Sequence, residues 1–233
     1  MKATVLSKAR AAARIMVLGL LAFWSGLATA ARSYPSEYDW RYMTISSLLY
    51  QDRNPHGYGW GRAGLVICGV CGLYWVRRGV RRHDPTTASL SAGFLCMALC
   101  ALLPSPFLGI AKPHEVLALT AFIAMCVGVT RLSFDALVRR WRISREVGRQ
   151  RLYAFAVSGL PLLPVVLAAA AQTYSLRSHL PWVTFAWRAR GIPMYWSFAF
   201  WEWVACAIYT AFLLWLVLSA RVSPSVQRYP RSA

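Results

Sequence analysis

Residues 33–61, SYPSEYDWRYMTISSLLYQDRNPHGYGWG, lie between two long apolar segments and determine the architecture that the sequence predicts. This stretch contains three of the eight acidic residues (Glu37, Asp39 and Asp52), the histidine His56 and a dense series of Tyr and Trp. Tyr and Trp are enriched where a membrane meets water. We therefore expect the stretch to lie at one face of a membrane and to cap a bundle of helices.

The composition favours a membrane protein over a soluble domain. The 233-residue chain is 58% hydrophobic and 15% charged, with a mean hydropathy of +0.42, whereas soluble domains are about a quarter charged. The net charge of +18 comes from basic residues between apolar blocks, as in cytoplasmic membrane loops. No separate basic face with interleaved aromatic residues indicates a nucleic-acid partner. All six cysteines lie in apolar blocks, which argues against a secreted disulfide scaffold.

Six segments are long and apolar enough to be considered as membrane spans, because about 20 helical residues cross a bilayer. They are residues 15–31, 60–76, 88–111, 114–138, 152–174 and 196–219. The prediction is an all-α protein: a polytopic six-helix bundle forming one integral-membrane domain over residues 1–233, with an outer loop at 32–59.

The charges of the connecting segments alternate along the chain. Basic residues are concentrated before the first span, between the second and third, between the fourth and fifth, and after the sixth. The positive-inside rule then places both termini in the cytoplasm, and we expect the protein in a bacterial cytoplasmic membrane. Residues 1–30 also fit a cleavable secretory signal ending in Ala28-Thr29-Ala30, which would leave five spans without reversing any later loop.

Small residues recur on the second predicted span. Gly64, Cys68 and Gly72 are four residues apart and would lie along one helix face. Such a stripe allows another helix to approach closely.

The predicted topology gathers most acids and histidines at the outer side. Glu202 lies within Phe-Trp-Glu-Trp in the last span, and a carboxylate at that depth is a functional candidate by default. It could instead lie at the interface, paired with Arg188 or Arg190. His114, at the start of the fourth span, is a second candidate, although Pro113 and Glu115 beside it are typical of an ordinary helix start.

Two further candidates, Asp52 and His56, belong to the sequence DRNPHG, which also has the composition of a simple turn. Ser46 is a candidate ligand-binding residue or nucleophile. Without a GxSxG motif, a helix cap or helix contact is the alternative interpretation.

The pattern Tyr38-Asp39-x4-Thr44-Ile-Ser-Ser-Leu48, followed by a glycine-rich start of the next helix, resembles the Frag/DRAM/Sfk-type superfamily of six-helix membrane proteins and their bacterial relatives of unknown function. His114 is compatible with the histidine near the start of the fourth helix in that group. The resemblance implies a six-helix bundle with a lipid-related role, such as the anchor-lipid remodelling or phospholipid distribution of the eukaryotic cousins.

Two functions follow from these residues. The leading hypothesis is that a lipid or other amphiphile binds at the outer face, with membrane lipids as partners. Its ligand-binding residues would be Arg41, Arg188, Arg190, Trp40 and Ser46, because arginine can bind a phosphate head. The alternative is an intramembrane hydrolase or transferase acting on a lipid-linked substrate. It would use Glu202, His114 and Asp52 as acid–base residues, or His114, Glu202 and His56 as metal ligands. The sequence identifies neither a cofactor nor a protein partner.

Overall fold

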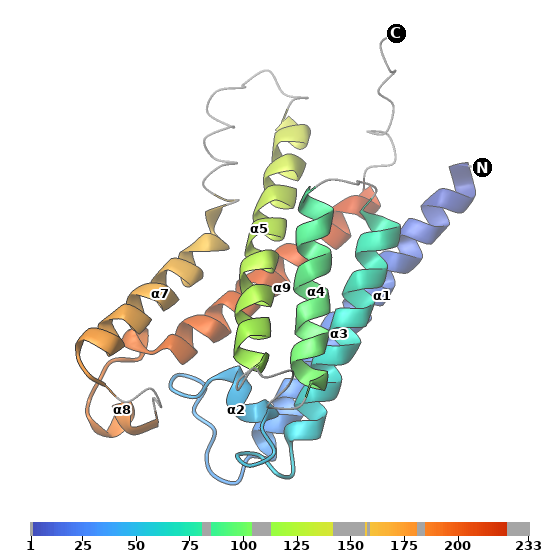
Figure 1. Ribbon diagram of the computed structural model, residues 1–233. Coiled ribbons are helices and arrows are strands. Elements are labelled where there is room, and N and C mark those ends of the chain that lie inside the picture. Colours follow the sequence, from blue (N-terminus) through green and yellow to red (C-terminus); the bar gives the residue numbers. More distant parts are fainter. Residues whose placement is uncertain are drawn as a thin grey trace.

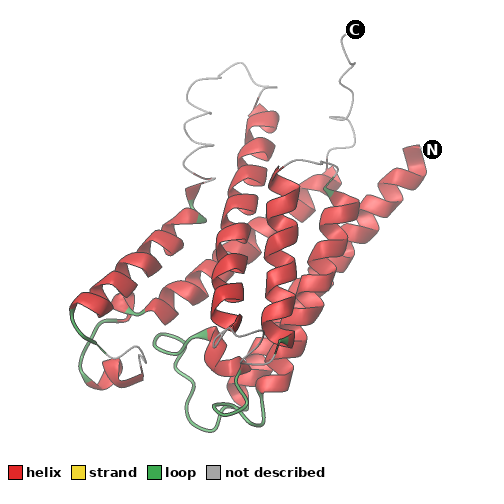
Figure 2. Ribbon diagram, in the orientation of Figure 1, coloured by secondary structure: helices red, strands yellow, loops and turns green. Residues whose placement is uncertain are grey.

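The computed structural model describes residues 2–80, 85–103, 113–141, 157, 159–180 and 185–222. Every regular element in this described part is helical, as the sequence predicts (Figure 2). The elements are α1 (Lys2–Arg32), α2 (Ile45–Leu49), α3 (Tyr58–Gly79), α4 (Pro85–Leu102), α5 (Pro113–Trp141), α7 (Leu162–Arg177), α8 (Phe185–Ala189), the 3-10 helix η1 (Met194–Trp196) and α9 (Phe198–Val222).

The long helices form a bundle with its two short helices at one end (Figure 1). α3 packs between α1 and α4, and α4 packs between α3 and α5. α9 crosses behind this layer, contacting α1 and α5, and α7 lies against α9. The start of α1 and the end of α9 lie at one end of the bundle, whereas α2 and α8 lie at the other (Figure 1).

Five helices are long and apolar enough to cross a membrane: Ala9–Arg32, Tyr58–Gly79, Pro85–Leu102, Pro113–Asp135 and Phe198–Leu218. They correspond to the first, second, third, fourth and sixth predicted spans. Large apolar side chains on their outer faces remain exposed, such as Leu119 at 63% and Leu18 at 61%. Large apolar side chains exposed along several helices are expected where a protein meets a membrane. The fold is therefore that of a multi-pass membrane protein.

The predicted six-span count is not confirmed, because the described part of the fifth predicted segment is short. Only α7 represents it as a regular helix, with 16 residues, which at 1.5 Å per residue span about 24 Å rather than the roughly 30 Å of a hydrocarbon core. A turn at Leu160–Pro161 precedes α7, and proline at that position cannot continue a helix from upstream. Residues 152–156 and 158 of the fifth predicted span, and residues 104–111 of the third, lie outside the described residues.

The small-residue stripe on α3 makes close helix contacts, as predicted. A Cβ atom added at Gly64 would lie 2.7 Å from the Ala22 carbonyl oxygen of α1. One added at Gly72 would lie 2.2 Å from the Phe94 ring of α4. The absence of side chains at these positions therefore allows α3 to pack closely on both neighbours. Signal cleavage after Ala30, the alternative for the N-terminus, would remove the α1 side of this packing.

The outer segment caps one end of the bundle, also as predicted. The Tyr38 hydroxyl donates to the carbonyl oxygens of Met43 (2.8 Å) and Thr44 (3.0 Å), and Trp203 Nε1 of α9 lies 3.2 Å from that hydroxyl. Burial, with the negative charge of Glu202 nearby, raises the pKa of the Tyr38 phenol well above its usual range. Tyr38 therefore stays protonated and remains a donor at physiological pH.

Asn54 fixes the other half of this cap. Its side chain is 0% exposed. Its amide nitrogen donates to the carbonyl oxygens of Ala30 (2.9 Å) and Leu48 (3.2 Å), and its amide oxygen accepts from the Gly57 N–H (3.1 Å). The last carbonyls of a helix have no partner within that helix. One buried side chain thus joins the ends of α1 and α2 to the start of α3.

Candidate functional site

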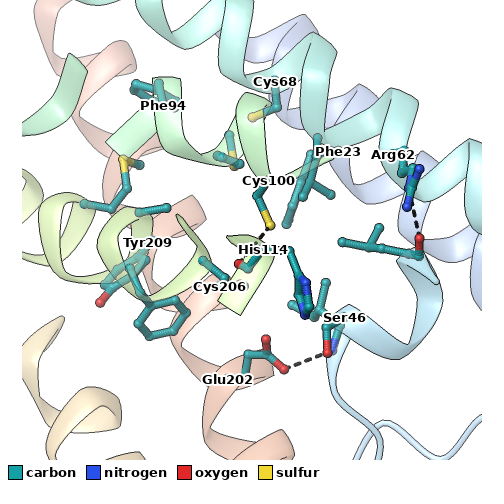
Figure 3. A pocket seen from close by; sticks show the side chains of 18 of the residues that line it. Phe23, Ser46, Arg62, Cys68, Phe94, Cys100, His114, Glu202, Cys206 and Tyr209 are labelled. Carbon is teal, nitrogen blue, oxygen red and sulfur yellow. Dashed lines mark hydrogen bonds between the residues drawn. The ribbon is translucent and has the colours of Figure 1, made fainter. Parts of the chain in front are cut away.

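A cavity of about 160 Å³ lies inside the bundle, between α1, α2, α3, α4, α5 and α9 (Figure 3). Most of its wall is apolar. Representative apolar residues in the wall are Leu20, Phe23, Phe94, Met97, Phe122 and Leu213. Its size is close to that of an engineered apolar cavity of about 150 Å³ that binds benzene. It can therefore hold a ring or a segment of one alkyl chain.

The charged residues of the cavity and its histidine gather at the α2 end, whereas the hydroxyl residues Tyr209 and Thr210 line the wall further along α9. Ser46 and Tyr50 come from α2 and its C-cap, Arg62 from the first turns of α3, His114 from the start of α5, and Glu202 from the start of α9. Figure 3 shows Ser46, His114 and Glu202 close together, with Phe94 and Tyr209 toward the opposite part of the cavity. The cavity is consequently charged at one end and mostly apolar along its walls.

Glu202 lies near the start of α9 and binds the first residue of α2. Its Oε2 accepts the backbone N–H of Ile45 at 2.9 Å, and this N–H is the first of α2. The first N–H groups of a helix have no partner within it, so the carboxylate satisfies one of them. The expected alternative, an ion pair of Glu202 with Arg188 or Arg190, does not occur among the described residues.

Arg62 fixes the opposite end of α2. Its Nε donates to the Leu49 carbonyl oxygen at 3.0 Å, and its guanidinium carbon lies 5.3 Å from the centre of the Tyr58 ring. Glu202 and Arg62 therefore hold the first and last residues of α2, from two different helices. Sequence reasoning missed Arg62, because nothing in its local sequence distinguishes it from the other basic residues near helix starts.

His114 lies between these two charged residues and contacts Tyr50. The Tyr50 hydroxyl lies against the imidazole nitrogens of His114, 2.7 Å from Nδ1, and the two rings meet edge to face. The Cys100 thiol donates to the His114 backbone carbonyl at 3.5 Å. These contacts fix the position of the imidazole at the α2 end of the cavity.

The structure separates Asp52 and His56 from this site. Both side chains are exposed in the turns that precede α3, and neither lines the cavity. Within the described residues, no group of three or more His, Cys, Asp or Glu side chains is arranged to hold a metal ion. The hypothetical metal set of His114, Glu202 and His56 is therefore not assembled, because the DRNPHG turn directs Asn54 inward and leaves its neighbours outside.

The predicted phosphate-binding arginines also lie outside the cavity. Arg41 binds Asp39 through Nε (2.7 Å) and a terminal nitrogen (3.0 Å), and Arg188 approaches the same carboxylate at 3.3 Å. Arg190 is exposed just after α8. Trp40 is 46% exposed and stacks on Phe200 with ring centres 5.7 Å apart, which is typical of an aromatic residue at headgroup depth.

The cluster around Asp39 has a structural role. Partial burial of the carboxyl opposes its ionisation, but the hydrogen bonds and charge of Arg41, with the charge of Arg188, outweigh burial and lower the pKa of Asp39. The ionised carboxylate thus joins the outer loop to the segment that contains α8. A second link between the same segments is the hydrogen bond from the Tyr42 hydroxyl to the Ile192 carbonyl, at 2.7 Å.

Comparison of the chain with protein-family models, with curated proteins and with solved structures gives no match. What the fold and the site define is a class: a multi-pass helical membrane protein with an internal cavity that is polar at one end. The resemblance to the Frag/DRAM/Sfk-type superfamily stays a prediction.

Proposed function

We propose that the protein binds a lipid or another amphiphile in the cavity, with the head group at the α2 end and the chain along the apolar walls. The observation that carries this proposal is the division of the cavity surface. The charged side chains and the imidazole occupy one end, and the remaining wall is mostly apolar apart from the hydroxyl groups of Tyr209 and Thr210. An amphiphile matches this division, whereas a fully polar solute would leave the apolar wall without a partner.

The cavity volume narrows the ligand further. About 160 Å³ is enough for a segment of one acyl or isoprenoid chain, but not for the two chains of a phospholipid. We therefore propose a single-chain amphiphile, or one chain of a larger lipid whose remaining part stays in the bilayer.

The orientation of the protein completes the proposal. The end opposite α2 contains Arg77 and Arg78 in the last turn of α3, together with the start of α1 (Figure 1). By the positive-inside rule this end faces the cytoplasm of a bacterial cell, and the polar end of the cavity faces outward. Reporter fusions after residue 80 should be active in the cytoplasm, and activity outside the cell would contradict this orientation.

Filling the cavity tests the binding proposal directly. Ala118 of α5 lines the cavity, whereas Leu119 beside it is 63% exposed on the outer face. A phenyl ring introduced by Ala118→Phe occupies about the volume of one benzene, which is most of the space. We expect this variant to retain at least tenfold less radiolabelled single-chain lipid than the wild type in a non-ionic detergent. The matched variant Leu119→Phe should retain the wild-type amount.

Two results would contradict the proposal. One is equal retention by the wild type and Ala118→Phe when both elute as the same monodisperse species. The other is no saturable retention by the wild type with any single-chain lipid.

One observation favours acid–base catalysis as a second function: Glu202, His114 and Ser46 lie in the wall of the same cavity. A carboxylate and an imidazole are suitable as a general acid–base pair, so a bound ester-linked lipid could be cleaved there. The test is the release of fatty acid from an ester-linked single-chain lipid by the wild type and by Glu202→Gln. Release that does not exceed that of the variant would exclude this function.

A further inference from the structure

Two opposite charges face the same end of the cavity without forming an ion pair. Glu202 and Arg62 both line it, and in Figure 3 they lie on either side of His114 and Ser46. Among the described residues, ion pairs form at Asp39, and none joins Glu202 to Arg62. Both side chains are only partly exposed, and a charge with reduced access to water is stabilised by a partner of opposite charge.

Each of the two residues has polar atoms left over after it binds α2. Glu202 uses Oε2 for Ile45, and its Oε1 accepts no hydrogen bond within the described residues. Arg62 uses Nε for Leu49, and its two terminal nitrogens donate none there. Counting hydrogen bonds to the described residues alone, the cavity end therefore presents one carboxylate oxygen and two guanidinium nitrogens that a ligand could bind.

We propose that the bound head group is a zwitterion, with an ammonium group bound by Glu202 and a phosphate bound by Arg62. The terminal nitrogens of arginine match two phosphate oxygens, and a carboxylate oxygen accepts N–H donors from a primary ammonium. The Tyr50–His114 pair lies between them and supplies further hydrogen-bonding groups. The ligand is thus of the phosphoethanolamine class. This inference rests on the proposed function, since it specifies the head group of the amphiphile bound there.

The experiment compares three radiolabelled lipids of equal chain length on the full-length protein in a non-ionic detergent. Lysophosphatidylethanolamine carries both charges, lysophosphatidylglycerol carries only the phosphate, and monoacylglycerol carries neither. We expect the wild type to bind the first at least tenfold more tightly than the second, and the second more tightly than the third. This order of affinity needs no variant and cannot be lost through misfolding.

Variants then assign the two charges. Glu202→Gln keeps an acceptor for the Ile45 N–H, so it should bring the zwitterionic lipid to the affinity of the anionic one and leave monoacylglycerol unchanged. Arg62→Gln should weaken both phospholipids about tenfold or more. The control Arg78→Gln removes an exposed arginine near the other end of the same helix and should change no affinity. A purely structural role for Glu202 would weaken all three lipids alike.

The outcomes of this experiment distinguish failure of this inference from failure of the proposed function on which it rests. Equal binding of all three lipids would overturn the proposal of a zwitterionic head group and would leave the proposal of amphiphile binding intact. Binding of none of them would overturn both. A further outcome is that free phosphoethanolamine displaces the bound lipid as strongly as lysophosphatidylethanolamine does. That result would support a zwitterionic head group and would overturn the proposal that the acyl chain contributes to binding.

Discussion

Replacing Asn54 by alanine should loosen the cap at the α2 end of the bundle. The substitution removes two donated hydrogen bonds, to Ala30 at 2.9 Å and Leu48 at 3.2 Å, and one accepted from Gly57 at 3.1 Å. At about 1 kcal/mol net for each bond, opening of the cap should become easier by about 2–3 kcal/mol. The population of the open cap would then rise roughly 30- to 140-fold.

Hydrogen exchange of the amides in residues 45–57 measures this population, because exchange there requires local opening. The matched control is Asp52→Asn, which changes an exposed side chain of the same turn and should leave exchange unchanged. A rise of less than about threefold for Asn54→Ala, or an equal rise for both variants, would refute the view that Asn54 joins α1, α2 and α3.

Three further substitutions test other parts of the structure. Gly64→Ala should destabilise the protein by about 1–3 kcal/mol in reversible unfolding, since the new Cβ would meet backbone of α1, whereas Gly59→Ala, which meets nothing within 4 Å, should not. Asp39→Asn at pH 7 should speed proteolysis of residues 33–44. In the wild type this loosening should begin only as the pH falls below about 4, the pKa of an aspartate in the unfolded chain. The pKa of Asp39 is lower in the fold, so the stabilisation by its charge is complete above that pH and is lost as the pH falls further. Thr210→Val removes the acceptor of the 3.1 Å bond from Trp24 Nε1 and should cost about 0.6 kcal/mol, so a loss above about 2 kcal/mol would contradict this role.

The sequence predicts the elements of this fold better than its polar contacts. Long apolar blocks identify five of the helices, and the four-residue spacing of Gly64, Cys68 and Gly72 predicts a close helix contact, because both signals follow from helix geometry alone. A carboxylate within an apolar span can also be recognised from the local sequence, because placing a charge there is energetically costly. For that reason Glu202 could be singled out before its neighbours were known.

The polar contacts depend on how the chain turns between helices. Asp52, Asn54 and His56 lie in one turn, yet only the side chain of Asn54 is buried, and composition does not specify which side chain points inward. Asp39 pairs with Arg41 and with Arg188, which is distant in sequence, and neither arginine lines the cavity. Such pairings arise only when α8 and the outer loop meet in the fold.

Under the proposed function, the short helix α2 would couple occupancy of the cavity to order in residues 33–57. It contributes Ser46 to the cavity and is fixed at its two ends by Glu202 and Arg62. A molecule that binds only while α2 is in place must stabilise that arrangement, by about 2.7 kcal/mol when its free concentration is a hundred times its Kd. Protection of residues 33–57 against exchange would then rise with ligand concentration, so the end of the bundle that α2 covers would report whether the cavity is filled.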